Sequence, residues 1–443
     1  MSAVDSIPNF SSINECIEWV QRKDLALAKM KLICQLLNHP EKRQKTVHIA
    51  GTNGKGSTVA FLASILQNSG LRVGTFTSPH LDEWNERIKA DGVSITNQEF
   101  FLITQRIMNK LENRVKPTIF EFLTAVALYH FAEIKSVDLV IYEVGVGGKY
   151  DATNVISPLV CGITNIDYDH LNYLGNTLTD IAQKKAGIIK KNVLCFTTET
   201  RPQILSLLQK IAQEKQSNLH KISPPKKFAF DSNKLITNFN LITKNYTFNL
   251  KTKMIGRHQL KNISLAIHIA LYLQKYFPQI TQNNIEKGIE TVFWPSRMEL
   301  VSHKPLLFLD GAHNPGGIKS LIQALKTFFP NKKPIFLISI MKDKQIDKML
   351  NALKKVACQI IFTELPESRK QEISKLKHNN TNKFRKITDY SKAFFSFYSL
   401  LDNEKIGIIC GSLHFTSLIK REFLVDKNSF ACFNDFPLRV KNR

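Results

Sequence analysis

Short apolar runs alternate with amphipathic stretches along most of this chain. Start signals for helices stand between the runs, such as the capping-box spacings Thr96-x-x-Glu99 and Thr177-x-x-Asp180. Alternation of this kind is typical of a doubly wound sheet of parallel strands covered by helices. The expected strands of this first region are residues 46–50, 72–78, 138–145, 158–166 and 192–198.

The pattern changes twice further along the chain. Residues 226–253 alternate polar and apolar positions between Asn-rich breaks, which predicts a small hairpin sheet, followed by helices near 258–276 and 282–292. After the proline break Trp294-Pro295-Ser296-Arg297, strands and helices alternate again. The expected strands there are 306–310, 334–340, 359–365 and 405–410, with helices at 315–328, 344–357 and 390–402. We predict two α/β domains: residues 1–296, of P-loop type, and residues 297–443, smaller and Rossmann-like.

The first apolar strand runs directly into the glycine-rich segment Gly51-Thr52-Asn53-Gly54-Lys55-Gly56-Ser57, which we call the phosphate loop. Three of its seven residues lack a Cβ, so backbone N–H groups can approach an anion closely. A helix expected at 56–68 directs its positive dipole end at the same point. Lys55 adds a charge for phosphates, and Ser57 or Thr58 offers a hydroxyl for Mg²⁺. The spacing is not that of a regular Walker A sequence, and a lysine-bearing surface turn is the alternative.

Composition argues against nucleic-acid-binding, membrane-spanning and disulfide-bonded classes of protein. The formal charge of +24 comes mostly from lysines spread along the chain, without a long basic tract or interleaved aromatic residues, so we expect no nucleic-acid partner. No apolar run is long enough for a membrane span, and the N-terminal residues do not resemble a signal peptide. The seven scattered cysteines, without a Cys-x-x-Cys pair, indicate reduced thiols. We expect a cytoplasmic monomer.

Polar side chains follow several of the expected strands, and the carboxyl ends of parallel strands meet at one edge. Ser78, Glu143 and His170 are placed in this way, and Glu143 has the position of a Walker B carboxylate, a hard ligand for Mg²⁺. The structural alternatives are a Ser-Pro turn, a solvated glutamate and a structural histidine. The pair Lys184-Lys185 ends a helix, where lysines ordinarily offset the dipole.

The second region has one such group of its own. Asp310 and His313 follow its first strand and precede a helix, so they are candidates for a crevice at that edge. A plain strand-to-helix turn is the alternative.

Eight motifs occur in one order: GTNGKGS, TSPHL…NERI, EVGVGGKYDATN, DH…LG, IAQKKAG, GRHQ..N, WPSR and DGAHNP. This series resembles dihydrofolate synthase/folylpolyglutamate synthase, a folate branch of the Mur ligase superfamily. The resemblance runs from about Ile49 to about Asn314, with a weaker tail at Met341–Lys344 and Gly411–Leu413. The chain departs from the usual pattern at Lys149, Lys184 and Ser296, and Lys149 in place of arginine loses forked donor geometry.

The resemblance implies roles for individual residues. Ser78 and Glu143 resemble ligands of one Mg²⁺, His170 resembles a ligand of a second, and Lys185 matches a lysine that the family carbamylates. Lys184 would help the neutral amine only modestly, because neighbours in a helix do not face each other. The implied ATP contacts are Asn53, Gly54, Lys55, Gly56, Ser57, Asn262, Arg297, Asp310 and His313. The implied pterin contacts are Thr118, Ile119, Phe120, Glu121, Tyr150, Asp151 and Ala152. Lys55, Lys185 and His170 are the implied catalytic residues.

The implied reaction is ATP-driven amide formation. The carboxylate of dihydropteroate or of a reduced folate attacks the γ-phosphate, and L-glutamate displaces phosphate from the acyl phosphate. Three alternatives stay open: a cell-wall Mur ligase, a P-loop nucleic-acid motor and a nucleotide-binding module without turnover. The folate reading also has a narrower form, a folylpolyglutamate synthase that does not use dihydropteroate.

Overall fold

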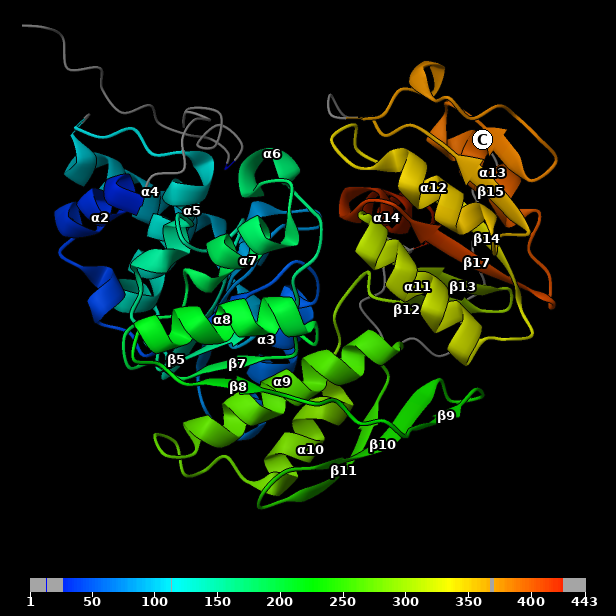
Figure 1. Ribbon diagram of the computed structural model, residues 1–443. Coiled ribbons are helices and arrows are strands. Elements are labelled where there is room, and N and C mark those ends of the chain that lie inside the picture. Colours follow the sequence, from blue (N-terminus) through cyan, green and yellow to red (C-terminus); the bar gives the residue numbers. More distant parts are fainter. Residues whose placement is uncertain (1–12, 14–26, 113, 367–369, 425–443) are drawn as a thin grey trace, which may run out of the picture. The chain divides into compact units, whose positions relative to one another are not determined.

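The computed structural model describes residues 13, 27–112, 114–366 and 370–424. Apart from Ile13, the N-terminal segment in which we expect no signal peptide lies outside these residues. The chain forms two compact units (Figure 1). Unit 1 ends at Val292 apart from two short excursions, residues 230–236 and 254–257, that belong with unit 2. Unit 2 otherwise starts at Phe293, so the predicted division at 296/297 stays a prediction.

Unit 1 is built on an eight-stranded sheet in the order β4-β3-β2-β5-β1-β6-β7-β8. The six strands from β2 to β8 in this order are parallel, and β3 and β4 add an antiparallel edge. The bounds are β1 Thr46–Ala50, β2 Val73–Phe76, β3 Ile88–Ala90, β4 Val93–Ser94, β5 Leu139–Glu143, β6 Val160–Ile163, β7 Cys195–Thr197 and β8 Leu219–Lys221. The predicted doubly wound sheet is confirmed, with strands shorter than predicted because their polar ends leave the ladder for loops.

Helices pack against this sheet through separate clusters of apolar side chains. Phe76 and Tyr142 of the sheet pack with α2, α4 and α5, whereas Ile163 packs with α7 and α8. Both predicted capping boxes form at the starts of α4 and α7. The bounds are α2 Leu27–Leu36, α3 Lys55–Asn68, α4 Asn97–Leu111, α5 Ile119–Tyr129, α6 Leu171–Leu174, α7 Leu178–Ala186, α8 Pro202–Glu214, α9 Arg257–Leu273 and α10 Gln282–Thr291.

The predicted hairpin sheet is present as three strands in the order β11-β10-β9. Its strands are β9 Ala229–Asp231, β10 Ile236–Ile242 and β11 Thr247–Thr252. The pair β10–β11 is antiparallel, with Phe239 opposite Leu250, and both side chains are buried. Helix α10 lies between β11 and α3 (Figure 1). Gly288 permits this approach, because a Cβ there would lie 2.6 Å from the Cα atom of Ile65.

Unit 2 contains a six-stranded sheet in the order β12-β13-β17-β14-β15-β16. Its parallel strands confirm the Rossmann-like prediction, while the pattern predicted neither of the two edge strands, the antiparallel β12 and the parallel β16. The strand bounds are β12 Glu299–His303, β13 Leu306–Leu309, β14 Lys333–Ile338, β15 Gln359–Phe362, β16 Phe384–Lys386 and β17 Lys405–Cys410. The helices are α11 Pro315–Phe328, α12 Ile346–Lys354, α13 Tyr390–Tyr398 and α14 Leu413–Ile419. Leu309, Leu337 and Phe397 are central to its apolar core.

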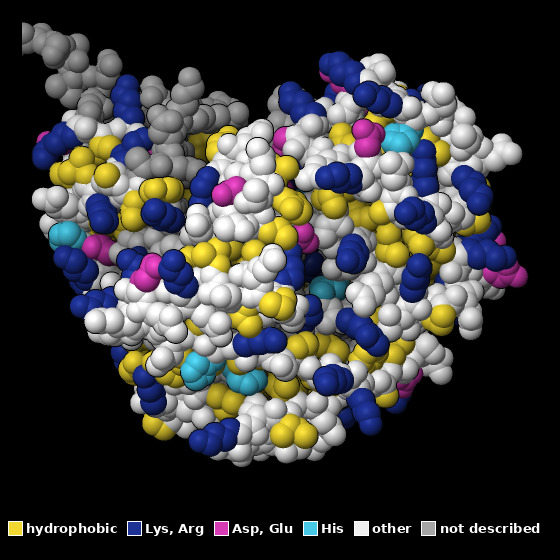
Figure 2. Space-filling model, in the orientation of Figure 1, with side chains coloured by type: hydrophobic (Ala, Val, Ile, Leu, Met, Phe, Trp, Pro, Cys, Tyr) yellow, Lys and Arg dark blue, Asp and Glu magenta, His cyan; other side chains and the backbone are white. Residues whose placement is uncertain are grey.

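Basic side chains are scattered over the visible face of each unit and do not form one tract (Figure 2). Within the described residues, no helix combines the length and the apolar character that a membrane crossing requires. Each of the five cysteines that the structure describes is a free thiol, and four of them are buried.

Candidate active site

The phosphate loop has the backbone that its glycines predict. Gly51 and Gly54 take positive φ angles of 145° and 84°, which L-residues with a side chain rarely adopt. Helix α3 begins at Lys55, one residue earlier than expected, and no side chain caps its first turn. The first N–H groups of α3 therefore point out of the helix end, where an anion can accept from them. Thr58 donates its hydroxyl to the Gly54 carbonyl (2.9 Å), which leaves Ser57 as the hydroxyl candidate.

Asn262 of helix α9 lies close against the turn at Gly54. A Cβ atom on Gly54 would lie 2.4 Å from the Asn262 side-chain oxygen. The Asn262 amide donates to the Gln259 side chain (2.9 Å), and both residues are buried. Asn262, the last residue of the GRHQ..N motif, thus lies against the phosphate loop inside unit 1.

An acid, a lysine and a strand end meet beside this loop. Glu143 is the last residue of β5, is 3% exposed and lies 3.9 Å from Lys55, measured from carboxylate oxygen to Nζ. Its second carboxylate oxygen accepts the backbone N–H of Ser78 at 3.2 Å. Ser78 follows β2, the parallel neighbour of β5, so the sheet register brings the two together. The structure therefore unites Lys55, Glu143 and Ser78 as the strand-end pattern predicts.

Arg87 belongs to the same neighbourhood, although we assigned it no role from the sequence. Its Nε–H donates to His80 (2.9 Å), and its guanidinium lies 4.8 Å from the centre of the Trp84 ring. Burial lowers the pKa of Arg87 to about 10, while the charge of Glu143 acts in the opposite direction. The TSPHL…NERI motif contains His80 and Arg87, and Trp84 lies between its two parts, so the motif was the available signal.

Lys185 is buried although it ends an otherwise amphipathic helix. It is 4% exposed, and its Nζ donates to the Gly51 carbonyl at 2.8 Å. Burial and then the charge of Lys55 lower the pKa of Lys185 to about 7, against the opposing charges of Asp169 and Asp151. Lys184 instead donates to the Tyr173 carbonyl near the surface. The cation that acts on Lys185 is therefore Lys55.

The loop after β6 carries His170 and is hydrogen-bonded to the phosphate loop. Asn165 accepts from the backbone N–H groups of Thr52 and Asn53, both at 2.9 Å. Thr52 also exchanges hydrogen bonds with the backbone of Asp167. His170 has a positive φ of 49°, and its Nε2 lies 4.0 Å from an Asp169 carboxylate oxygen. The loop thus reaches the same end of the sheet as Glu143.

An ion pair between the buried Glu199 and the partly exposed Arg201 also holds this loop. Glu199 accepts the N–H of Ile166 (2.9 Å), and Arg201 donates to the Ile166 carbonyl. Arg201 also donates to both Glu199 carboxylate oxygens, at 2.9 and 2.7 Å. Sequence reasoning missed this pair, because neither residue lies in a recognisable motif.

The side chains predicted to contact a pterin mostly make internal bonds. Thr118 and Glu121 form the capping box of α5 through bonds of 2.7 and 3.3 Å, and Asp151 caps the turn Ala152–Val155. Ile119 packs on the core around α5, and the Phe120 ring lies within 3 Å of where a Cβ on Gly145 would be. Tyr150 is half exposed. Contact with a pterin by these residues stays a prediction.

In unit 2, Asp310 is 7% exposed and serves the backbone at the end of β13. Its carboxylate oxygens accept the N–H groups of Met298 and Ala312, each at 2.9 Å. Burial raises the pKa of Asp310, while Arg297 opposes that shift. His313 bonds to the Gly311 carbonyl (2.8 Å) through Nδ1. The DGAHNP motif is thus a tightly bonded strand-to-helix turn, and its nucleotide contacts stay a prediction.

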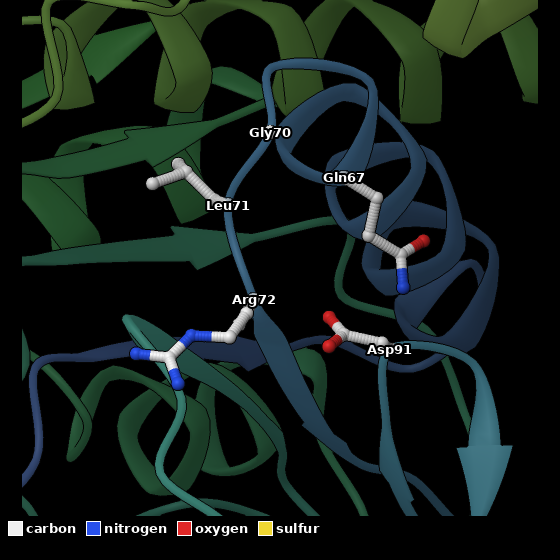
Figure 3. Close-up of a pocket in the computed structure, with 5 residues that line it drawn as sticks. All are labelled: Gln67, Gly70, Leu71, Arg72 and Asp91. Atoms are coloured by element: carbon white, nitrogen blue, oxygen red, sulfur yellow. The ribbon is translucent and has the colours of Figure 1, made fainter.

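One pocket of the described residues lies away from these side chains. Gln67, Gly70, Leu71, Arg72 and Asp91 line a pocket of about 470 Å³ at the amino-terminal end of β2 (Figure 3). Arg72 points away from Asp91 and pairs with Asp138, while Asp91 accepts the N–H of Val73. The pocket is therefore at the sheet edge opposite to Glu143, and its charged groups are already occupied.

Comparison with known proteins decides the family. The model of the Mur ligase middle domain matches residues 49–270, and that of the Mur ligase glutamate ligase domain matches residues 296–413. The dihydrofolate synthase/folylpolyglutamate synthase of Bacillus subtilis is 35% identical over 405 residues, which cover 89% of this chain and 94% of that protein. The chain belongs to the dihydrofolate synthase/folylpolyglutamate synthase branch of the Mur ligases.

Solved structures agree with this Mur ligase assignment. The folylpolyglutamate synthase of Mycobacterium tuberculosis complexed with ADP has a TM-score of 0.85 at 26% identity, covering 92% of this chain and 97% of that one. A bifunctional folylpolyglutamate synthase/dihydrofolate synthase with Mn, AMPPNP and L-glutamate bound has a TM-score of 0.80 at 27% identity, covering 92% and 96%. As a member of this branch, the chain is an ATP-dependent ligase that adds glutamate to folates.

Proposed function

We propose that ATP binds with its phosphates at the phosphate loop and that Lys55, Glu143 and Lys185 carry the phosphoryl step. The observation that supports this most directly is the convergence of all three on one short segment. Lys55 Nζ lies 3.9 Å from Glu143, and Lys185 Nζ lies 2.8 Å from the Gly51 carbonyl. The N–H groups of Asn53 to Ser57 and the dipole of α3 would favour the triphosphate charge. The reacting carboxylate and the triphosphate repel each other, so neutralisation of charge is the main requirement.

The residues present suit Mg²⁺ at one position. Magnesium is usually bound by one or two carboxylates together with phosphates and water, so a dedicated cage of acids is unnecessary. Accordingly, the described residues contain no group of three His, Cys, Asp or Glu side chains that could hold a metal alone. Glu143 and the Ser78 hydroxyl would hold this ion, and His170 with a modified Lys185 would hold a second. Bound there, the metal would stabilise negative charge on the phosphates.

We further propose that Lys185 is carbamylated. Carbamylation requires the neutral amine, which burial and Lys55 favour by lowering the pKa of Lys185 to about 7. The N–C bond forms between the neutral Nζ and carbon dioxide, and one proton is released to solvent, so a neutral amine is replaced by an anion. The resulting carboxylate would face Lys55 and a metal.

In the reaction, the carboxylate oxygen of the acceptor forms a bond to the γ-phosphorus as the bond to ADP breaks. The amine of L-glutamate then attacks the acyl carbon, loses a proton, and phosphate leaves. Lys55 and the loop N–H groups would hold the phosphate oxygens in line throughout. Asn262, Arg297, Asp310 and His313 are proposed nucleotide contacts, and residues 118–121 and 150–152 the proposed pterin contacts. We also propose a cytoplasmic monomer.

Both dihydropteroate and reduced folates are proposed acceptors, because each presents a carboxylate to the same γ-phosphate. Two relatives carry the double name dihydrofolate synthase/folylpolyglutamate synthase, including the Bacillus subtilis protein. Lys149, which lies 5.2 Å from the centre of the Tyr150 ring, is where the acceptor preference of this chain could differ from the family.

The test is glutamate-dependent release of ADP from purified protein. We expect release with dihydropteroate and also with tetrahydrofolate, and none when glutamate is omitted or when Lys55 is replaced by alanine. Turnover of tetrahydrofolate alone would restrict the function to polyglutamate synthesis. Turnover of neither, with activity on a peptidoglycan precursor, would favour a cell-wall ligase.

A further inference from the structure

A line of three buried polar side chains connects β1 to the loop after β5. His48 of β1 lies with Nε2 2.8 Å from the hydroxyl of Thr153, and that hydroxyl lies 2.5 Å from a carboxylate oxygen of Asp151. His48 and Thr153 are fully buried, and Asp151 is 1% exposed. Polar groups are placed in an interior only at a cost in free energy, so a buried line of this kind requires an explanation.

The chemistry of the three groups fixes the direction of these bonds. The Asp151 carboxylate already accepts the N–H groups of Thr153 and Val146, at 3.1 and 2.9 Å. Burial raises the pKa of Asp151, and the hydrogen bonds from Thr153 and Val146 oppose that shift. In its ionised form the carboxylate can only accept, so the Thr153 hydroxyl donates to Asp151 and accepts from His48. Burial lowers the pKa of His48 to about 3, so the ring is neutral with its proton on Nε2. Within the described residues, the other ring nitrogen has no hydrogen-bond partner.

Asp151 closes a loop that abuts the helix end carrying Lys185. The bond from Val146 to Asp151 ties together the two ends of the loop 146–151. From this loop, the N–H of Lys149 donates to the Lys184 carbonyl at 2.7 Å. Gly148 packs so closely on the helix end that a Cβ atom there would lie 2.8 Å from the Lys185 carbonyl.

A second bridge completes the contact between the loop and the end of α7. The Asn154 amide donates to the carbonyls of Lys149 and Gly187, at 3.2 and 3.0 Å. The position of the last turn of α7 therefore depends on the loop that Asp151 shapes. The negative charge of Asp151 also acts directly on the Lys185 amine.

We propose that His48 and Thr153 are positioning residues, which hold Asp151 and, through its loop, the end of α7 that presents Lys185 to the phosphate loop. This inference rests on the proposed role of Lys185. His48 touches neither phosphate loop nor substrate in this role. It acts through Thr153, so removal of the Thr153 hydroxyl tests the proposal most directly.

The experiment compares Thr153→Val, which removes only the hydroxyl, with Thr153→Ser, which keeps it. The matched control is Thr104→Val, because Thr104 is equally buried and its hydroxyl donates only to a helix carbonyl, that of Phe100 at 2.8 Å. If the free energy of a hydrogen bond to a charged group is lost from the transition state, kcat falls about tenfold to a hundredfold. We expect this fall in Thr153→Val, with the KM for ATP changed by less than about threefold. Thr153→Ser restores most of kcat, and Thr104→Val keeps it.

Two results would overturn the inference: a Thr153→Val enzyme as active as Thr104→Val, or a loss that Thr153→Ser does not restore. Should Thr153→Val fail to fold, His48→Gln, which keeps a donor, against His48→Leu, which removes it, gives the same comparison. The proposed function fails separately, through an active Lys185→Ala enzyme. An inactive Lys185→Ala enzyme beside a normal Thr153→Val enzyme sinks the positioning role alone.

Discussion

The side-chain nitrogen of Lys185 lies 2.8 Å from the carbonyl oxygen of Gly51, the first residue of the phosphate loop. The adjacent Lys184 turns to the surface and bonds to Tyr173. Successive residues of a helix point about 100° apart, so only one of two neighbouring lysines can face the sheet. This separation gives the two lysines different chemistry within one motif.

The Lys185 amine should make turnover dependent on pH. A lysine whose pKa is lowered to about 7 is protonated below that pH and neutral above it. Because carbamylation requires the neutral amine, we expect kcat to rise between about pH 6 and pH 8 and then to level. Removal of dissolved carbon dioxide should lower kcat, and added bicarbonate should restore it. Turnover that is flat across this range and indifferent to bicarbonate would contradict the proposal.

Substitution of the two lysines should separate them sharply. Lys185→Ala is expected to lose turnover by orders of magnitude and to regain part of it when a small carboxylate such as acetate is added. Lys184→Ala is the matched control, which we expect to stay within about threefold of the wild type because its partner is a surface carbonyl. Intact mass of the active protein provides the independent check. A plain amine at Lys185 in fully active enzyme would exclude the modification.

Gly54 should tolerate no side chain. Comparison with Gly70 separates the two causes, which are backbone strain and a clash with Asn262. Gly54 and Gly70 have similar φ angles, 84° and 77°, so alanine is strained by a comparable amount at either position. A Cβ on Gly54 would lie 2.4 Å from the Asn262 side chain, whereas one on Gly70 would meet nothing within 4 Å. We expect Gly54→Ala to raise the Kd for an ATP analogue at least tenfold and Gly70→Ala to leave it unchanged. If the two variants bound the ATP analogue equally well, the clash with Asn262 would not be what weakens binding in Gly54→Ala.

Local signals in the sequence locate the phosphate loop, Glu143 and Ser78, because a strand end followed by a polar residue needs only neighbouring positions to be recognised. The bonds that assemble the site are of another kind. His48 and Thr153 are 105 residues apart, and Asn53 and Asn165 are 112 apart. No local sequence pattern predicts contact between residues so far apart. Motif reasoning also assigned Asp151 and Asp310 to ligands without seeing that their carboxylates serve backbone N–H groups. Those bonds depend on loop conformations that spacing does not encode.

The Glu199–Arg201 pair should make the free energy of unfolding sensitive to acid. Burial alone would raise the pKa of Glu199, but the hydrogen bonds from Arg201 and Ile166 more than offset it and lower the pKa from 4.5 to about 2. A lowered carboxylate pKa gives stability that is complete above about pH 4.5 and disappears as the pH falls toward 2.

Glu199→Gln should therefore cost roughly 1–3 kcal/mol in urea unfolding at pH 7, and the difference from wild type should shrink on acidification. The control is Glu404→Gln, whose exposed pair with Lys333 should contribute less than about 1 kcal/mol. A difference that persists unchanged at pH 3 would show that the carboxylate charge is not its source.

Thr118 offers a test of whether a residue caps a helix, contacts a substrate or does both. Its hydroxyl accepts the N–H of Glu121 at 3.3 Å, and the Glu121 carboxylate accepts the N–H of Thr118 at 2.7 Å. Loss of such a cap costs about 1 kcal/mol of stability, and serine keeps the capping oxygen. We therefore expect Thr118→Ala to be less stable by about that amount and Thr118→Ser to match the wild type in urea unfolding. If the hydroxyl only caps α5, Thr118→Ala should keep its KM for tetrahydrofolate at temperatures well below unfolding. A KM that rises tenfold in Thr118→Ala and recovers in Thr118→Ser would instead place this hydroxyl at the acceptor, where the family resemblance puts it.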